Sequence, residues 1–150
     1  MDFFAFILPY NIKLLENALT HSSYANEVHS SYGSNERLEF LGDAVLDLVI
    51  ADYLYSNQKE KEGEMTKIRA SYVCENALYE YSIRLGLNEE LRLGKGEEDN
   101  DGRYRKAIVA DIFESFIGAM YLDQGIEKMG WGAYKEINLK FTNQVIGVKR

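Results

Sequence analysis

Four carboxylates in two otherwise apolar segments could bind a divalent cation. Glu39 and Asp43 stand four residues apart in the segment 38–52, and Asp111 and Glu114 stand three apart in the segment 107–122. Side chains at these separations lie on one face of an α-helix, one turn apart. Like charges at this spacing repel one another, and burying an unpaired carboxylate is costly. Each acidic face therefore needs a compensating positive charge.

A divalent metal ion is one such charge. Mg²⁺ and Mn²⁺ prefer oxygen ligands, so two carboxylate pairs that face each other across a helix pair would form an acidic cage with room for metal-bound water. The alternative is that the acids form structural salt bridges with Lys or Arg, or lie on a solvated edge, as carboxylate pairs on helices commonly do. Neither segment contains an interleaved basic residue, which weakens this alternative.

The elements that would position these acids are helices. The chain has 150 residues, is 46% hydrophobic and contains one proline, and its turn signals are sparse, so it is expected to form one all-α domain over residues 1–150. Residues 57–63 are predicted to be a charged loop and residues 94–106 a mobile surface loop. The expected helices cover residues 11 to about 29–33, 34 or 35 to about 55, 65–73, 75–85, 107–122 and much of 127–145.

The helix expected around residues 38–52 has three distinct sides. Its acidic strip contains Glu39, Asp43 and Asp47. Phe40 lies away from both this strip and the core stripe, where an apolar side chain is otherwise hard to place. The main core stripe is predicted to comprise Leu38, Leu41, Val45, Leu48 and Val49.

Composition limits the function classes. Lys and Arg number 17 against 24 acidic residues, and the net charge of -7 has the wrong sign for holding nucleic acid by bulk charge alone. The single cysteine, Cys74, cannot form an internal disulfide, which fits a reducing compartment. The apolar run 3–8 is too short to cross a membrane and lacks the features of a signal peptide. A cytoplasmic location and no membrane partner are therefore expected.

The segment that carries Glu39 and Asp43 resembles the signature of the ribonuclease III family. Its sequence, residues 35–46, is NERLEFLGDAVL. Further resemblance, in the same order and spacing, is found in ALTHSSY at 18–24, GEMTKIRA at 63–70, LGKGE at 93–97, and DIFE at 111–114 followed by GAMYLD at 118–123. The match covers about residues 12–126 and identifies a bacterial-type catalytic domain.

The resemblance implies an all-α endonuclease domain that forms a homodimer and hydrolyses double-stranded RNA to 5′-phosphate and 3′-hydroxyl ends, in rRNA and mRNA processing. Glu39, Asp43, Asp111 and Glu114 would bind Mg²⁺, with Mn²⁺ as a substitute, and Asp43 and Glu114 would be catalytic. Glu36 and Glu64 match acidic positions of the family that support the metal ligands without being metal ligands themselves. Phe40 would insert into a socket on the partner subunit, although a core role is equally compatible. Basic residues of the 94–106 loop would contact RNA phosphates: Lys95, Arg103, Arg105 and Lys106.

Several alternatives stay open at this point. Nothing outside the match is long enough for the double-stranded RNA-binding domain of typical bacterial enzymes, so weak, salt-dependent RNA binding is expected. The chain could be a natural minimal enzyme, an excised domain or a truncation. It could also be a non-catalytic RNA-binding or ribosome-associated protein of the same fold, although all four acids are present. A calcium loop at Glu97 is disfavoured because its twelfth position is Ile108. His21 is expected to be structural.

Overall fold

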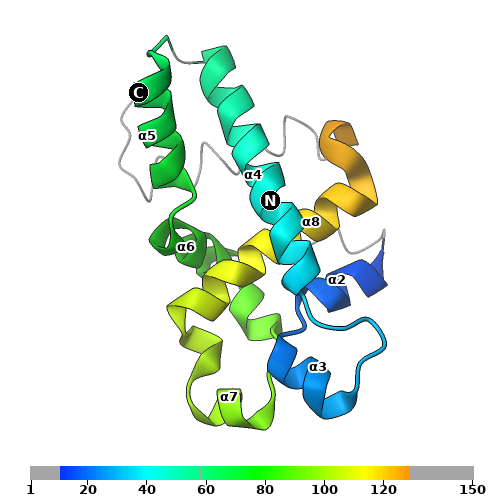
Figure 1. Ribbon diagram of the computed structural model, residues 1–150. Helices are drawn as coiled ribbons and strands as arrows, with labels where there is room; N and C mark the ends of the chain where they lie inside the picture. Colours follow the sequence, from blue (N-terminus) through cyan, green and yellow to red (C-terminus); the bar gives the residue numbers. More distant parts are fainter. Residues whose placement is uncertain (1–10, 58, 129–150) are drawn as a thin grey trace.

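Two long helices, α4 (Glu36–Asn57) and α8 (Lys106–Lys128), cross at the centre of the computed structural model, which describes residues 11–57 and 59–128 (Figure 1). The expected all-α fold is confirmed: in these ranges the extended pairing is limited to one bridge, between Thr20 and Arg92. The other elements are α2 (Ile12–Ala18), α3 (Ser22–Val28), α5 (Glu62–Tyr72), α6 (Glu75–Leu85), α7 (Lys95–Asp99) and the 3₁₀ turns η1 (Leu87–Glu90) and η2 (Gly102–Tyr104).

The backbones of α4 and α8 touch where the helices cross. A Cβ atom on Gly42 would lie 1.7 Å from the carbonyl oxygen of Glu114, and a Cβ atom on Gly118 would lie 2.3 Å from the carbonyl oxygen of Leu38. No side chain fits at either position without moving one helix away from the other. The two glycines therefore set the separation of the helices, and Gly42 lies directly before Asp43 in the acidic strip.

The main core packs α6 against α8 and the inner face of α4. Tyr81 on α6 and Phe113 on α8 have ring centroids 5.2 Å apart. Leu48 was expected in the core stripe, and this prediction is wrong, because its side chain is 56% exposed. It lies on the outer side of α4 together with Phe40 and Tyr55, which are 82% and 80% exposed. The core instead contains Val45, Leu46, Val49, Leu78, Ile112, Phe116 and Ile117, among others.

The single helix expected from residue 11 to about residue 29 is also wrong, since the chain forms α2 and α3 with a break at residues 19–21. At the break, His21 caps α3: its Nδ1 accepts the backbone N–H of Ser23 at 3.2 Å. The expected structural role of His21 is therefore confirmed. The carbonyl groups at the break accept hydrogen bonds from distant segments, so they are not available to continue the helix.

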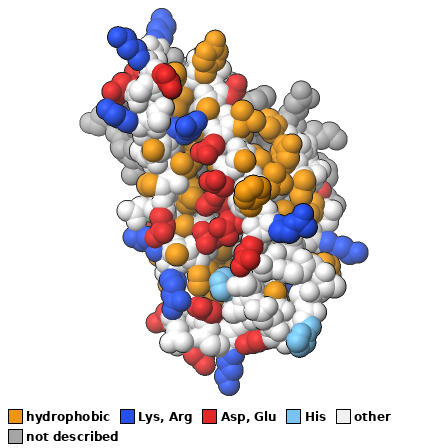
Figure 2. Space-filling model, in the orientation of Figure 1, with side chains coloured by type: hydrophobic (Ala, Val, Ile, Leu, Met, Phe, Trp, Pro, Cys, Tyr) orange, Lys and Arg blue, Asp and Glu red, His pale blue; other side chains and the backbone are white. Residues whose placement is uncertain are grey.

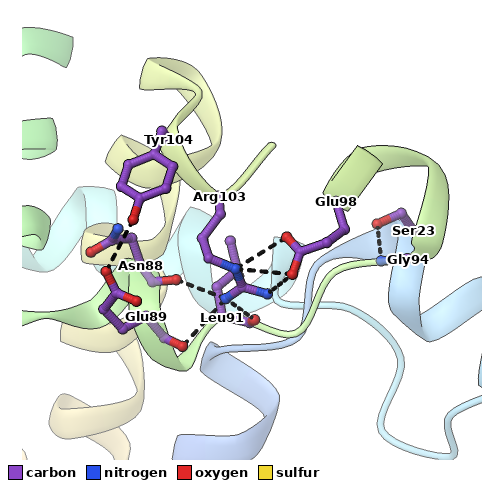
Figure 3. A network of polar contacts seen from close by, with 8 residues as sticks. All are labelled: Ser23, Asn88, Glu89, Leu91, Gly94, Glu98, Arg103 and Tyr104. Carbon is purple, nitrogen blue, oxygen red and sulfur yellow. Dashed lines mark hydrogen bonds and ion pairs between the residues drawn. The ribbon is translucent and has the colours of Figure 1, made fainter. Parts of the chain in front are cut away.

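The expected loop at residues 94–106 is folded into α7 and η2 (Figure 3). The Arg103 guanidinium donates to both carboxylate oxygens of Glu98 and, through one nitrogen, to backbone carbonyls after α6, including Leu91 at 2.7 Å. At the start of α7, Ser23 Oγ accepts the Gly94 N–H at 2.8 Å. Polar composition predicted mobility here, but paired charges and backbone contacts fold the segment.

Other boundaries agree with the sequence or differ slightly. The helix at 75–85 is confirmed, with Gly86 in the left-handed region at φ 71° as its C-terminal stop. The charged loop at 57–63 is shorter than expected because α5 begins at Glu62. The backbone of α8 leaves helical geometry at Gly125, near the predicted stop. The helical segment expected over much of 127–145 lies, beyond Lys128, outside the described residues.

We predict that Gly42→Ala destabilises the protein by roughly 3 kcal/mol, because the added methyl group overlaps a backbone carbonyl that cannot move independently. Gly63→Ala is the matched control, since a Cβ at this position of α5 meets nothing within 4 Å and alanine favours helix. Urea unfolding measures both variants. Equal stability of the Gly42 variant and wild type would show that the helices are not held in backbone contact.

Candidate functional site

The four carboxylates singled out by their spacing lie on the two crossing helices. Glu39 and Asp43 are on α4, and Asp111 and Glu114 are on α8, whose first turns precede the crossing at Gly118. Figure 2 shows acidic side chains gathered in a band over the region where α4 and α8 cross, bordered on one side by hydrophobic side chains. The i, i+4 and i, i+3 spacings thus produce acidic faces that the crossing brings together.

Burial and mutual repulsion raise the pKa of three of these acids, Glu39, Asp111 and Glu114. Burial raises the pKa of Glu114 to about 8, with further contributions from the charge of Asp43 and a hydrogen bond to it, and from Glu39 and Asp111. Burial likewise raises the pKa of Glu39 to about 7, followed by the charges of Asp111, Glu36 and Asp43. The carboxylates of each helix therefore raise the pKa of a glutamate on the other, so the two acidic faces lie near each other.

The structural salt-bridge alternative finds no support in the part of the chain that is described. Salt bridges among the described residues join Lys67 to Glu64, Arg92 to Glu16, Arg103 to Glu98 and Arg105 to Glu97. None of these salt bridges includes any of the four acids. Glu39, Asp111 and Glu114 are partly buried and have raised pKa values, and the four acids together form a site with excess negative charge and no basic partner. That excess is what a cation would relieve.

The donor set suits a hard divalent metal ion, because all four residues offer carboxylate oxygens. Within the described residues, however, no three carboxylate, imidazole or thiol groups lie in a group that could hold a metal ion as they stand. The residues fit the metal by the chemistry of their donor atoms, and binding would require their side chains to converge.

The two supporting acids expected from the sequence differ in position. Glu36 begins α4, and its charge contributes to the raised pKa of Glu39. Glu64 is on the first turn of α5, exposed, and lies 3.5 Å from Lys67 Nζ, so no contact joins it to the four acids here. Sequence reasoning missed Glu75 at the start of α6, whose charge, after burial, raises the pKa of Asp111. Its spacing gave no signal, because only the packing of α6 on α8 brings it near.

The basic residues expected to contact phosphates differ in the contacts that their side chains make. Arg103 and Arg105 pair with Glu98 and Glu97 at 2.7 Å and 3.0 Å, so their guanidinium groups help to fold the segment that carries them. Lys95 and Lys106 are exposed. Lys106 Nζ lies 5.8 Å above the Tyr79 ring. The lysines are thus freer than the arginines to reach an anion.

Comparison with known proteins shows that this chain is similar to ribonuclease III proteins. A family model described as Ribonuclease-III-like matches residues 11–138. Ribonuclease 3 of Listeria innocua is 54% identical over 121 residues, which are 79% of this chain and 53% of that protein. Ribonuclease 3 of Oceanobacillus iheyensis is 55% identical over 118 residues, 77% of this chain and 52% of that protein. The chain therefore spans about half the length of these curated relatives.

Solved structures agree with the sequence relatives. The nuclease domain of ribonuclease III from Campylobacter jejuni superimposes with a TM-score of 0.74 at 36% identity, covering 91% of this chain and 89% of that one. That structure is described as showing flexibility in a region involved in dimer formation. A second structure of the same domain gives a TM-score of 0.73 at 33% identity. No helix of the described residues is long and apolar enough to span a membrane.

The stability of the metal-free protein is predicted to decrease as the pH rises from about 5 to about 8. In the folded protein the pKa values of Glu39 and Glu114 are about 7 and about 8, against an ordinary value of 4.5. In this window the folded state binds more protons than the unfolded chain, so raising the pH favours unfolding. Solvent screening of these partly exposed groups limits the effect to on the order of 1 kcal/mol, or a few degrees in Tm.

Thermal unfolding in EDTA across this pH range measures the decrease. Glu114→Gln should remove much of it, whereas Glu90→Gln, at an exposed position on η1, should retain the wild-type pH dependence. Stability that rises with pH in both wild type and the Glu114 variant would contradict the shared burial of these acids.

Proposed function

The chain belongs to the ribonuclease III family, and on this premise we propose that it is an endoribonuclease that hydrolyses double-stranded RNA with the help of a divalent metal ion. The observation that carries the proposal is the proximity of Glu39 and Asp43 on one helix to Asp111 and Glu114 on the other, without a basic partner among the described residues. Matching relatives named Ribonuclease 3 support the choice of substrate and reaction.

The four carboxylates would hold Mg²⁺, with Mn²⁺ as a substitute, through their oxygen atoms. When bound, the metal supplies Lewis-acid activation of water and of the scissile phosphate. Hydrolysis forms a bond between the water oxygen and phosphorus and breaks the bond from phosphorus to the 3′ oxygen, which leaves 5′-phosphate and 3′-hydroxyl ends. Near neutral pH, Glu114 can retain a proton at its carboxyl group and share it with Asp43 until positive charge enters the site.

A homodimer is the proposed assembly. The outer side of α4 exposes Phe40, Leu48 and Tyr55, an apolar stripe that a single chain leaves in contact with water. Phe40 follows Glu39 directly, so a partner subunit seated on this stripe would lie beside the acidic site. Pairing two such stripes around a twofold axis would provide one site for each RNA strand. The related Campylobacter domain, described as having a region involved in dimer formation, supports this assembly.

RNA would be held by shape and by few phosphate contacts. The net charge is -7, so positive charge must act locally, and the exposed lysines Lys95 and Lys106 are the best placed of the predicted contacts. Contacts to 2′-hydroxyls and the minor-groove shape permit weak sequence preference. The expected binding is weak and decreases with rising salt, because the lysine contacts to phosphate are electrostatic. The proposed cellular role is processing of ribosomal and messenger RNA in the cytoplasm.

We predict that the dimer, verified by sedimentation, cleaves a long RNA duplex at low salt with Mg²⁺, and that Asp43→Asn slows cleavage by about 100-fold or more because a ligand charge is lost. Asp52→Asn is the matched control, since Asp52 is another exposed aspartate of α4 that lies outside the acid set. End labelling identifies the 5′-phosphate products.

Intact duplex after incubation with the wild-type dimer and Mg²⁺ would contradict the proposal and favour a non-catalytic RNA-binding protein of the same fold. Equal loss of cleavage in the Asp43 and Asp52 variants would contradict the assignment of the acids. Gel-shift binding of the same duplex in EDTA distinguishes an inactive protein that binds RNA from one that does not.

A further inference from the structure

One buried carbonyl group receives hydrogen bonds from both acid-bearing segments. The carbonyl oxygen of Ala18, at the end of α2, lies 3.2 Å from Nδ2 of Asn35, which directly precedes α4. It also lies 2.7 Å from Oγ of Ser115 on α8, whose hydroxyl is shared with the Ile112 carbonyl at 2.9 Å. Ala18 and Ser115 are fully buried, and Asn35 is 4% exposed. We call these three residues the α2 junction.

The backbone around the α2 junction is fixed by further hydrogen bonds. Asn35 N–H donates to the carbonyl oxygen of Thr20 at 2.9 Å, and Arg92 N–H donates to that of Leu19 at 2.8 Å. Carbonyls 18, 19 and 20 therefore all accept hydrogen bonds from segments outside α2. Because these groups are bonded and buried, moving the junction would leave several backbone groups without partners, at a high cost.

Each donor of the junction is adjacent to a proposed metal ligand. Ser115 follows Glu114 in the chain, and the carbonyl oxygen of Asn35 accepts the N–H of Glu39 at 2.9 Å. The glycine crossing sets how closely α4 and α8 approach, and core side chains of both helices pack beside it. The junction ties both helices to the end of α2, which further limits their relative rotation and so helps to set the direction in which the acidic faces point.

We propose that Asn35 and Ser115 are positioning residues for the carboxylate site: through the Ala18 carbonyl they hold the acidic faces of α4 and α8 toward each other. This inference rests on the proposed function, because it concerns the affinity of that site for a divalent metal ion. Neither side chain would touch the metal. Metal ligands commonly depend on hydrogen-bonded neighbours in this way, and losing such a neighbour typically weakens metal binding by about 10-fold or more.

The chain offers a matched control for Ser115. Ser82 on α6 is also fully buried, and its hydroxyl donates to the carbonyl oxygen of Val109 on α8 at 2.7 Å. Ser115→Ala and Ser82→Ala each remove one buried hydroxyl that contacts a neighbouring helix, so both should lower the urea midpoint to a similar extent. Only Ser115 is part of the α2 junction. A role limited to stability would therefore affect both variants alike.

The test is Mn²⁺ binding to the folded, RNA-free dimer, measured by electron paramagnetic resonance of the free ion. Ser115→Ala is expected to raise the dissociation constant by about 10-fold, and Ser82→Ala to leave it within about twofold of wild type. Asn35→Ala should also raise it. The double variant should weaken binding by more than the product of the single effects, because the Ala18 carbonyl then loses both donors.

Unchanged Mn²⁺ affinity in Ser115→Ala and Asn35→Ala, with wild type binding normally, would overturn this inference and leave the proposed function intact. Absence of Mn²⁺ binding by wild type would instead overturn the proposed metal site and the inference with it. Should Ser115→Ala fail to fold, Asn35→Ala is compared with Asn17→Ala, whose Nδ2 bonds the Ser34 carbonyl at 3.1 Å outside the junction. Equal Mn²⁺ affinities in these two variants would likewise overturn the inference.

Discussion

Backbone contact between α4 and α8 at Gly42 and Gly118 is the constraint on which the rest of the structure depends. Larger residues would separate the helices by the width of a side chain, and carboxylates on either side would then no longer share one space. Because of this contact, α4 buries one side against α8 and still exposes acids on another side. The polar and apolar residues of the two long helices are therefore only weakly separated into faces. The position of Gly42 between Glu39 and Asp43 joins the packing requirement to the chemistry in one short segment.

The close approach of α4 and α8 brings carboxylates near one another, which is electrostatically unfavourable at the site. Burial and mutual repulsion raise the pKa of Glu39 to about 7 and that of Glu114 to about 8, so the metal-free site holds protons where ordinary glutamates would not. A divalent cation would displace these protons and reverse the repulsion. On the proposed function, packing that is unfavourable for the carboxylates alone would favour binding of a hard, doubly charged ion, which is the behaviour expected of a functional site.

Structural features that depend on local spacing could be predicted from the sequence. Features that are set by contacts between residues far apart in the chain could not. Helical periodicity and the family motif located the four acids and most helix boundaries. The break after Ala18 was missed because its carbonyls are bonded by Asn35, Ser115 and Arg92, which lie far away in the chain. The folded segment 94–106 was missed because its polar residues pair with each other. Glu75 could not be found because only helix packing brings its charge near Asp111.

A crystal structure with Mn²⁺ located by anomalous scattering would show directly whether the crossing forms one metal site from both helices. A shared site predicts an anomalous peak bonded to carboxylate oxygens from α4 and α8 together. Mn²⁺ bound elsewhere, or the four acids paired with Lys or Arg side chains at full Mn²⁺ occupancy of other sites, would contradict it.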